Sequence, residues 1–125
     1  MTIRVTKSFK FDSAHYLPKY DGKCHELHGH TYHLDVTVEG NINEDDKSPK
    51  QGMIVDFTDV KRIVNTLIVD KFDHKLLNNF YANPTAEIMV VDIFSKLDRA
   101  FSAEGMTLYS CRLWETETSY AEVIR

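Results

Sequence analysis

The sequence predicts an α+β fold, in which two helices cover one face of an antiparallel sheet of about four strands. Segments near both ends of the chain have the residue pattern of strands, whereas two segments between them carry apolar residues at helical spacing. The length of 125 residues fits a single domain over 1–125, and a hydrophobic fraction of 42% can supply its core.

The first two strands are predicted from strict alternation. Residues 3–11 place apolar side chains on one parity and polar side chains on the other, and residues 31–39 repeat that pattern. Each is therefore expected to be a half-buried strand. The polar segment 41–51 contains Pro49 and is expected to be an exposed loop, followed by a short strand at 53–55.

Helical spacing marks the middle of the chain. The first helix is expected after Asp56, a suitable N-cap, and its apolar face holds Val60, Ile63, Val64, Leu67 and Ile68. The second helix is expected to begin near 83–85, with Pro84 in its first turn and Gly105 beyond its end.

Two strand-like runs, 107–115 and 119–124, close the chain and complete the order β-β-α-α-β-β. The helices leave one face of the sheet uncovered. Association with further copies of the chain is the simplest way to cover it, so we expect a homo-oligomer.

Charge and composition exclude several classes of protein. A formal net charge of −4 without a Lys/Arg cluster argues against binding nucleic acid. No apolar stretch approaches the ~20 residues of a membrane span, and residues 1–7 lack a signal-peptide apolar region. A cytoplasmic location is the expectation, with Cys24 and Cys111 as reduced thiols.

The strongest chemical signal is the segment from Cys24 to His30. His28 and His30 lie two residues apart at the start of a strand, on the parity of its inward set, so both imidazoles face the interior. A metal ion would explain that arrangement. Hairpin-like pairing of the first two strands would add His15 as a third ligand. Three protein ligands leave one zinc position open, as in catalytic sites.

Each of these residues also has an ordinary interpretation. His-x-His pairs occur in strands without metal, and a lone histidine such as His15 is more often a surface or cap residue. We interpret His33 as a non-ligand because it faces away from His28 and His30, and His25 because it lies in the approach loop.

Four further residues could take part in chemistry. Cys24 is a candidate base or nucleophile, since a neighbouring cation favours thiolate, although a single cysteine is usually a buried thiol. Asp73 and His74 could relay protons or could form an exposed ion pair. Glu115 could accept two N–H bonds from a flat heterocycle or could be a solvated strand-end acid.

Six motifs together resemble the 6-pyruvoyltetrahydropterin synthase family over nearly the whole chain. They are Phe11-Asp12-Ser13-Ala14-His15, Cys24-x-x-x-His28-Gly29-His30-Thr31-Tyr32, Gly52-Met53-Ile54-Val55-Asp56-Phe57, Phe72-Asp73-His74-Lys75-Leu76-Leu77-Asn78, Asn83-Pro84-Thr85-Ala86-Glu87 and Trp114-Glu115-Thr116. The four-position step from Cys24 to His28 is similar to that of the bacterial 6-carboxytetrahydropterin synthases of queuosine biosynthesis.

This resemblance implies the tunnelling fold, with sheets joined into a barrel, a hexamer built as a dimer of trimers, and active sites at subunit interfaces. It implies a lyase that acts on 7,8-dihydroneopterin triphosphate, with Zn²⁺ as cofactor held by His15, His28 and His30. The same resemblance assigns catalysis to Cys24, Asp73, His74 and Glu115, and pterin binding to Glu115 with Thr85 and Glu87. A 6-pyruvoyltetrahydropterin product and a non-catalytic zinc module are the alternatives.

Overall fold

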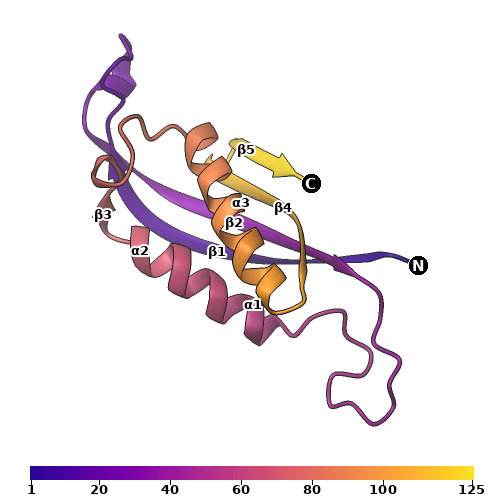
Figure 1. The fold of residues 1–125 in the computed structure, drawn as a ribbon. Helices are drawn as coiled ribbons and strands as arrows, with labels where there is room; N and C mark the ends of the chain where they lie inside the picture. The colour runs from indigo at the N-terminus through magenta and orange to yellow at the C-terminus, as the bar shows by residue number, and fades with distance from the viewer.

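The computed structural model describes all of residues 1–125 and confirms the α+β fold (Figure 1). Four strands run antiparallel to their neighbours: β1 (Ile3–His15), β2 (His28–Gly40), β4 (Thr107–Thr116) and β5 (Ser119–Ile124). A two-residue strand, β3 (Lys75–Leu76), pairs in parallel with β1, so the order is β3-β1-β2-β4-β5. The sheet therefore has five strands, one more than predicted.

The first two strands are longer than the alternation predicted. β1 continues to His15 and β2 begins at His28, because polar residues such as Ser13 occupy inward positions that apolar counting misses. The strand predicted at 53–55 is wrong. Residues 54 and 55 form a bend instead, while Asn43 N–H donates to Met53 O at 2.9 Å and Gly52 N–H donates to Asn43 O at 2.8 Å.

A single long helix follows the 41–56 loop. It comprises α1 (Phe57–Val64), a wider π-helical turn (Asn65–Val69) and α2 (Asp70–Phe72). Asp56 caps its start as predicted, because its carboxylate accepts from Thr58 N–H at 2.8 Å.

The π-helical turn shifts the apolar face of this helix by about one residue. At about 100° per residue, a regular helix that buries Val60 and Val64 would next turn Lys71 toward the core. The extra residue in the wide turn instead buries Phe72, which has no exposed surface, while Ile68 stays buried as the regular spacing predicts. The chain then leaves the helix directly at Asp73.

The second predicted helix is α3 (Ala86–Ala103). Thr85 is its N-cap, and the Thr85 hydroxyl accepts from Ile88 N–H at 3.2 Å. Pro84 therefore precedes the cap and does not lie in the first turn, which corrects the prediction. Gly105 follows the helix with φ of 78°, a conformation that glycine adopts without strain.

All the helices lie on one face of the sheet (Figure 1), and a single cluster of 21 buried residues fills the space between the two layers. The opposite, outer face is polar, and its side chains bond across the strands. Arg4 Nε donates to Glu39 at 2.9 Å, and Ser8 Oγ donates to Asp35 at 2.6 Å. Because it is polar, this face is suited to contact with water or with another polar surface, and not to burial in an apolar core.

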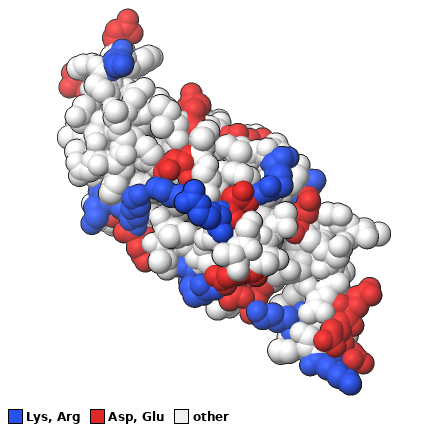
Figure 2. Space-filling model, in the orientation of Figure 1, with Lys and Arg blue, Asp and Glu red and all other residues white.

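Two loops project from opposite ends of the molecule, residues 16–27 at one end and 41–56 at the other (Figure 1). Basic and acidic side chains are interspersed on the face in Figure 2, with Glu44, Asp45 and Asp46 in the second loop. None of the helices combines the length and apolar character that crossing a membrane requires.

Candidate metal centre

Three imidazoles converge at the end of β1 and the start of β2. Antiparallel pairing sets His15 opposite His28 and Ser13 opposite His30, so all three rings lie on the helix-covered face. His15 is only 1% exposed. One nitrogen from each ring lies within 4.8 Å of those of the other two. The pairing of the first two strands thus brings together the three histidines that the sequence predicted to meet.

Backbone carbonyls fix which nitrogen of two rings carries the proton. His15 Nδ1–H donates to Pro84 O at 2.9 Å, and His28 Nδ1–H donates to Glu26 O at 2.7 Å. In neutral imidazoles this leaves both Nε2 atoms without hydrogen, yet they lie 3.0 Å apart. Two facing lone pairs at that distance repel each other, and a metal ion that accepts both of them removes the repulsion.

His30 supplies the third nitrogen. Its Nε2 is buried and has no hydrogen-bond partner, an arrangement that costs about 1–3 kcal/mol if nothing binds there. Burial lowers the pKa of His30, which favours the neutral ring that a metal requires. The donor set fits a borderline ion such as zinc, with each of two rings oriented by a carbonyl.

A carboxylate from β4 faces the same point. Glu115 lies 4.0 Å from His15 Nε2 and 3.9 Å from His30 Nε2. Beneath it lies the fully buried Tyr32, whose pKa is raised by burial and then by the charge of Glu115. The Tyr32 phenol therefore stays protonated as the floor of the centre.

Asp73 and His74 lie elsewhere. His74 Nδ1 is 3.0 Å from Asp73 Oδ2, and the other Asp73 oxygen accepts from Asp12 N–H at 2.9 Å. That backbone donor, followed by His74, holds the pKa of Asp73 below its usual value. The pair is therefore an ionised carboxylate beside an imidazole that is 78% exposed, as a proton relay requires.

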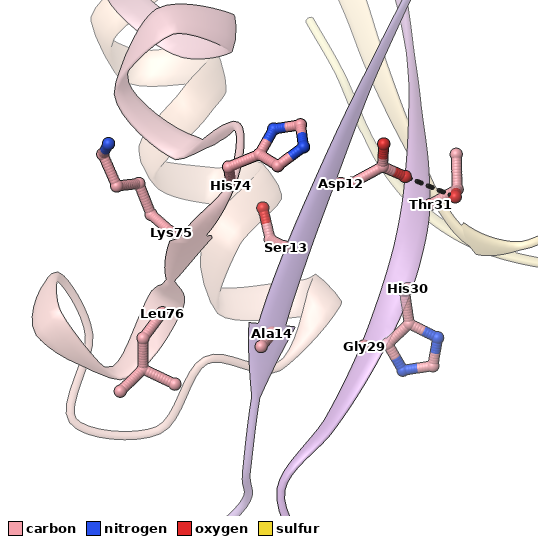
Figure 3. Close-up of a pocket in the computed structure, with 9 residues that line it drawn as sticks. All are labelled: Asp12, Ser13, Ala14, Gly29, His30, Thr31, His74, Lys75 and Leu76. Atoms are coloured by element: carbon pink, nitrogen blue, oxygen red, sulfur yellow. Dashed lines mark hydrogen bonds between the residues drawn. The ribbon is translucent and has the colours of Figure 1, made fainter.

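His74 of this pair borders a hollow of about 550 Å³ on the outer face of the sheet. Asp12 and Thr31 line the hollow and have the outward parity, and their side chains form the hydrogen bond drawn in Figure 3. Figure 3 also shows the His30 ring turned away from His74. Within one chain the three-imidazole cluster and the Asp73–His74 pair thus occupy opposite sides of the sheet.

The remaining predicted residues are dispersed. Cys24 lies half-buried in a short turn, Lys23–His25, of the 16–27 loop, where its carbonyl accepts from Leu17 N–H at 2.9 Å. The group that converges within 4.8 Å contains no thiol. Glu87 is exposed in the first turn of α3. Cys111 is buried in the core, which raises its thiol pKa to about 12 and makes it inert.

The Thr85 hydroxyl has a structural task that the sequence did not reveal, since it caps α3 directly after the Pro84 carbonyl that orients His15. Thr85→Ala should lower the free energy of unfolding by about 1 kcal/mol, because the Ile88 N–H loses its acceptor. Thr85→Ser should stay within about 0.5 kcal/mol of wild type. Urea denaturation of both variants checks this. Equal stability of Thr85→Ala and wild type would show that the Thr85 hydroxyl does not stabilise α3 as its N-cap.

Other supporting groups were missed altogether. The carbonyls of Glu26 and Pro84 leave no trace in side-chain patterns. Asn78 holds the chain next to His15 by two bonds, donating to Tyr16 O at 2.9 Å and accepting from Tyr16 N–H at 3.0 Å. Asn78 ends the Phe72–Asn78 motif, but no local pattern indicates that its partner lies 62 residues away.

A model of the 6-pyruvoyl tetrahydropterin synthase family matches residues 4–125. The chain belongs to this family. Among curated relatives, the family member from Haemophilus influenzae named 6-carboxy-5,6,7,8-tetrahydropterin synthase is 36% identical over 96% of this chain and 97% of its own length. A protein of Archaeoglobus fulgidus, named putative 6-carboxy-5,6,7,8-tetrahydropterin synthase, is 38% identical over 100% of this chain and 96% of its own.

The fold of the family is shared as well. The structure of Caenorhabditis elegans 6-pyruvoyl tetrahydropterin synthase superposes with a TM-score of 0.83 at 24% identity, covering 100% of this chain and 96% of that chain. The architecture predicted for the family, an antiparallel sheet with helices on one face, is thereby confirmed.

Proposed function

We propose that this protein is a zinc-dependent lyase that converts 7,8-dihydroneopterin triphosphate into 6-carboxy-5,6,7,8-tetrahydropterin, with release of acetaldehyde and triphosphate. The observation that carries the proposal is the meeting of three imidazole nitrogens, two of which lie 3.0 Å apart. The names of the curated relatives support the product. Queuosine and related 7-deazapurines are the proposed destination of that product.

His15, His28 and His30 would hold the zinc ion. When bound, zinc would supply a Lewis acid that polarises hydroxyl or carbonyl oxygens of the substrate side chain. The protein contributes a site that is already shaped, because carbonyls orient the rings of His15 and His28 and Tyr32 packs against those of His15 and His30.

Proton transfer is assigned to three residues. The Cys24 thiolate would remove a proton from the substrate side chain, which is the task of a general base. His74 would pass protons to and from the leaving fragments, while the ionised Asp73 holds its ring by the 3.0 Å contact. Glu115 would accept N–H bonds from the amine-bearing edge of the pterin, with Thr85 and Glu87 as further pocket residues.

A complete site would need two copies of the chain. The imidazole cluster lies on the inner face of the sheet, whereas His74 borders the hollow on the outer face. We therefore propose that His74 and Asp73 serve the metal centre of a neighbouring subunit.

The two edges of the sheet allow such an assembly. β3 covers only Ser13 and Ala14 of β1, so most of that edge is unpaired, as is the free edge of β5. Since neighbouring strands alternate in direction, β1 and β5 run opposite ways. The β5 strand of one copy can therefore pair antiparallel with β1 of the next and close a ring. A trimeric ring, doubled to a hexamer, is the proposed assembly.

Mixing inactive variants tests the shared site. Cys24→Ala and His74→Ala should each be inactive alone. Co-expression should restore activity, because some interfaces then combine an intact Cys24 with an intact His74 from the neighbour. With random assembly, about a quarter of interfaces recover both residues. Specific activity of the co-purified oligomer measures this, and no recovery would place both residues in one subunit's site.

The backbone at His74 offers a further test, because its φ of 58° is unfavourable for any residue with a Cβ. His74→Gly should raise the free energy of unfolding by about 1 kcal/mol by relieving this strain. The same change should reduce kcat roughly 100-fold or more by removing the proton carrier. Thermal unfolding and steady-state kinetics measure the two effects. Retained activity of His74→Gly would show that His74 is not the proton carrier.

The product assay decides between related activities. Incubation of the zinc-loaded protein with 7,8-dihydroneopterin triphosphate should yield acetaldehyde and triphosphate in equal amounts. Triphosphate without acetaldehyde would mean that the carbon chain stays intact, and the activity would be 6-pyruvoyltetrahydropterin synthesis. If neither acetaldehyde nor triphosphate forms, the result would favour a non-catalytic zinc module.

A further inference from the structure

The surroundings of Glu115 suggest a role in metal binding. Zinc bound by three histidines keeps one position for a fourth ligand, which in catalytic sites is water or substrate. Ligand atoms of a tetrahedral zinc site lie about 3.3 Å apart, given bonds of about 2.0–2.1 Å. The carboxylate of Glu115 lies 3.9 Å from His30 Nε2 and 4.0 Å from His15 Nε2. A shift of less than about 1 Å, smaller than a rotamer change, would bring it to ligand distance.

Charge favours the same contact. Neutral imidazoles cannot balance the charge of a divalent ion, and no other acidic side chain lies within 4.0 Å of these rings. Glu115 in turn has no Lys or Arg within 4.0 Å, although only 28% of its side chain is exposed. The half-buried carboxylate lacks a cationic partner, and so do the three imidazoles. One metal ion between them would satisfy both.

The backbone holds Glu115 in this position. Trp114 pairs with Tyr120 and Thr116 pairs with Ser119, so Glu115 is the extra residue of a β-bulge. On the outer face, Trp114 Nε1–H donates to Asp35 at 2.9 Å and anchors the strand. The residues on both sides of Glu115 are therefore held in place, and the Glu115 side chain faces the imidazoles.

We infer that Glu115 is the fourth zinc ligand in the substrate-free protein and leaves the metal when a pterin binds. Without substrate, all four zinc positions are then filled by protein ligands. When the pterin binds, its N–H edge donates hydrogen bonds to the same Glu115 carboxylate. Exchange of Glu115 between metal and pterin couples substrate recognition to opening of the metal. This inference rests on the proposed zinc centre but not on the lyase reaction.

Zinc affinity of three proteins tests the ligation, measured by competition with a chelating dye. Glu115→Gln should bind zinc at least ~10-fold more weakly than wild type, since an amide is a poorer zinc ligand than a carboxylate. Glu117→Gln is the matched control, an exposed glutamate two residues further along in the turn that follows β4, and should bind as wild type does. Equal zinc affinity of Glu115→Gln and wild type would overturn the inference.

A crystal structure of the zinc-loaded protein separates a ligand from a neighbour. One Glu115 oxygen should lie about 2.0–2.2 Å from zinc without pterin, and beyond about 3 Å with 7,8-dihydroneopterin bound. Water as the fourth ligand of the pterin-free protein, with Glu115 beyond about 3 Å, would reject the inference. Lyase activity with that outcome would reject only the role of Glu115, whereas failure of wild type to bind zinc would reject the proposed function as well.

Discussion

Replacement of Cys24 by alanine should abolish turnover while leaving zinc content unchanged. Cys24 lies outside the group of three imidazoles, in a turn that is held by a backbone bond from Leu17 rather than by its own side chain. Loss of the thiol therefore removes the proposed proton acceptor without disturbing the metal ligands. General bases contribute about 10²–10⁴-fold, so kcat should fall at least ~10³-fold, toward the detection limit.

Three measurements belong to this prediction: kcat, zinc per chain and thermal unfolding of Cys24→Ala. Cys111→Ala is an unsuitable control because Cys111 is buried in the core. His25→Ala is a better one, since His25 is the exposed neighbour of Cys24 in the same turn and should keep kcat within about twofold. Full activity of Cys24→Ala would refute its assignment as the base.

Replacement of His28 by alanine should remove both zinc and activity. His28 Nε2 lies 3.0 Å from His15 Nε2, and the His28 ring is oriented by the Glu26 carbonyl. Its loss removes one of the three nitrogen atoms that converge on the ion, and that ion is then held less tightly. We expect zinc affinity to fall ~100-fold or more and kcat/KM to fall with it.

Stability should respond differently from activity in the same variant. In the apo-protein, His28→Ala removes the unfavourable approach of two lone pairs, so the variant should lose little stability without metal. Wild type should gain stability from added zinc and His28→Ala should not, because only a bound ligand shifts the unfolding equilibrium. Thermal unfolding with and without zinc shows this, and equal zinc stabilisation of both proteins would place the metal elsewhere.

Much of the fold was predictable because its signals are periodic. Alternation in 3–11 and 31–39 located β1 and β2, and the parity of His28 and His30 placed both rings on the inner face. The residues that escaped prediction depend on contacts across long sequence separations. The β3 strand consists of two residues that pair only because the helix end delivers them beside Ser13.

The residues of the candidate site also fall into those that local spacing predicts and those that depend on long-range contacts. Local spacing brought His15, His28 and His30 together, since hairpin pairing converts sequence distance into register. Local spacing could not show that Asp73 and His74 lie across the sheet from that cluster. Their place depends on the π-helical turn, which no hydrophobic pattern of regular helical period reveals.

Zinc analysis by mass spectrometry of three proteins tests the central claim most directly: wild type, His15→Ala/His28→Ala and Asp12→Asn/Asp73→Asn. The third protein removes the structure's other group of metal-capable side chains, Asp12, Asp73 and His74. We predict about one zinc per chain in wild type and in the aspartate variant, and almost none in the histidine variant. Zinc retained by the histidine variant but lost from the aspartate variant would contradict the account.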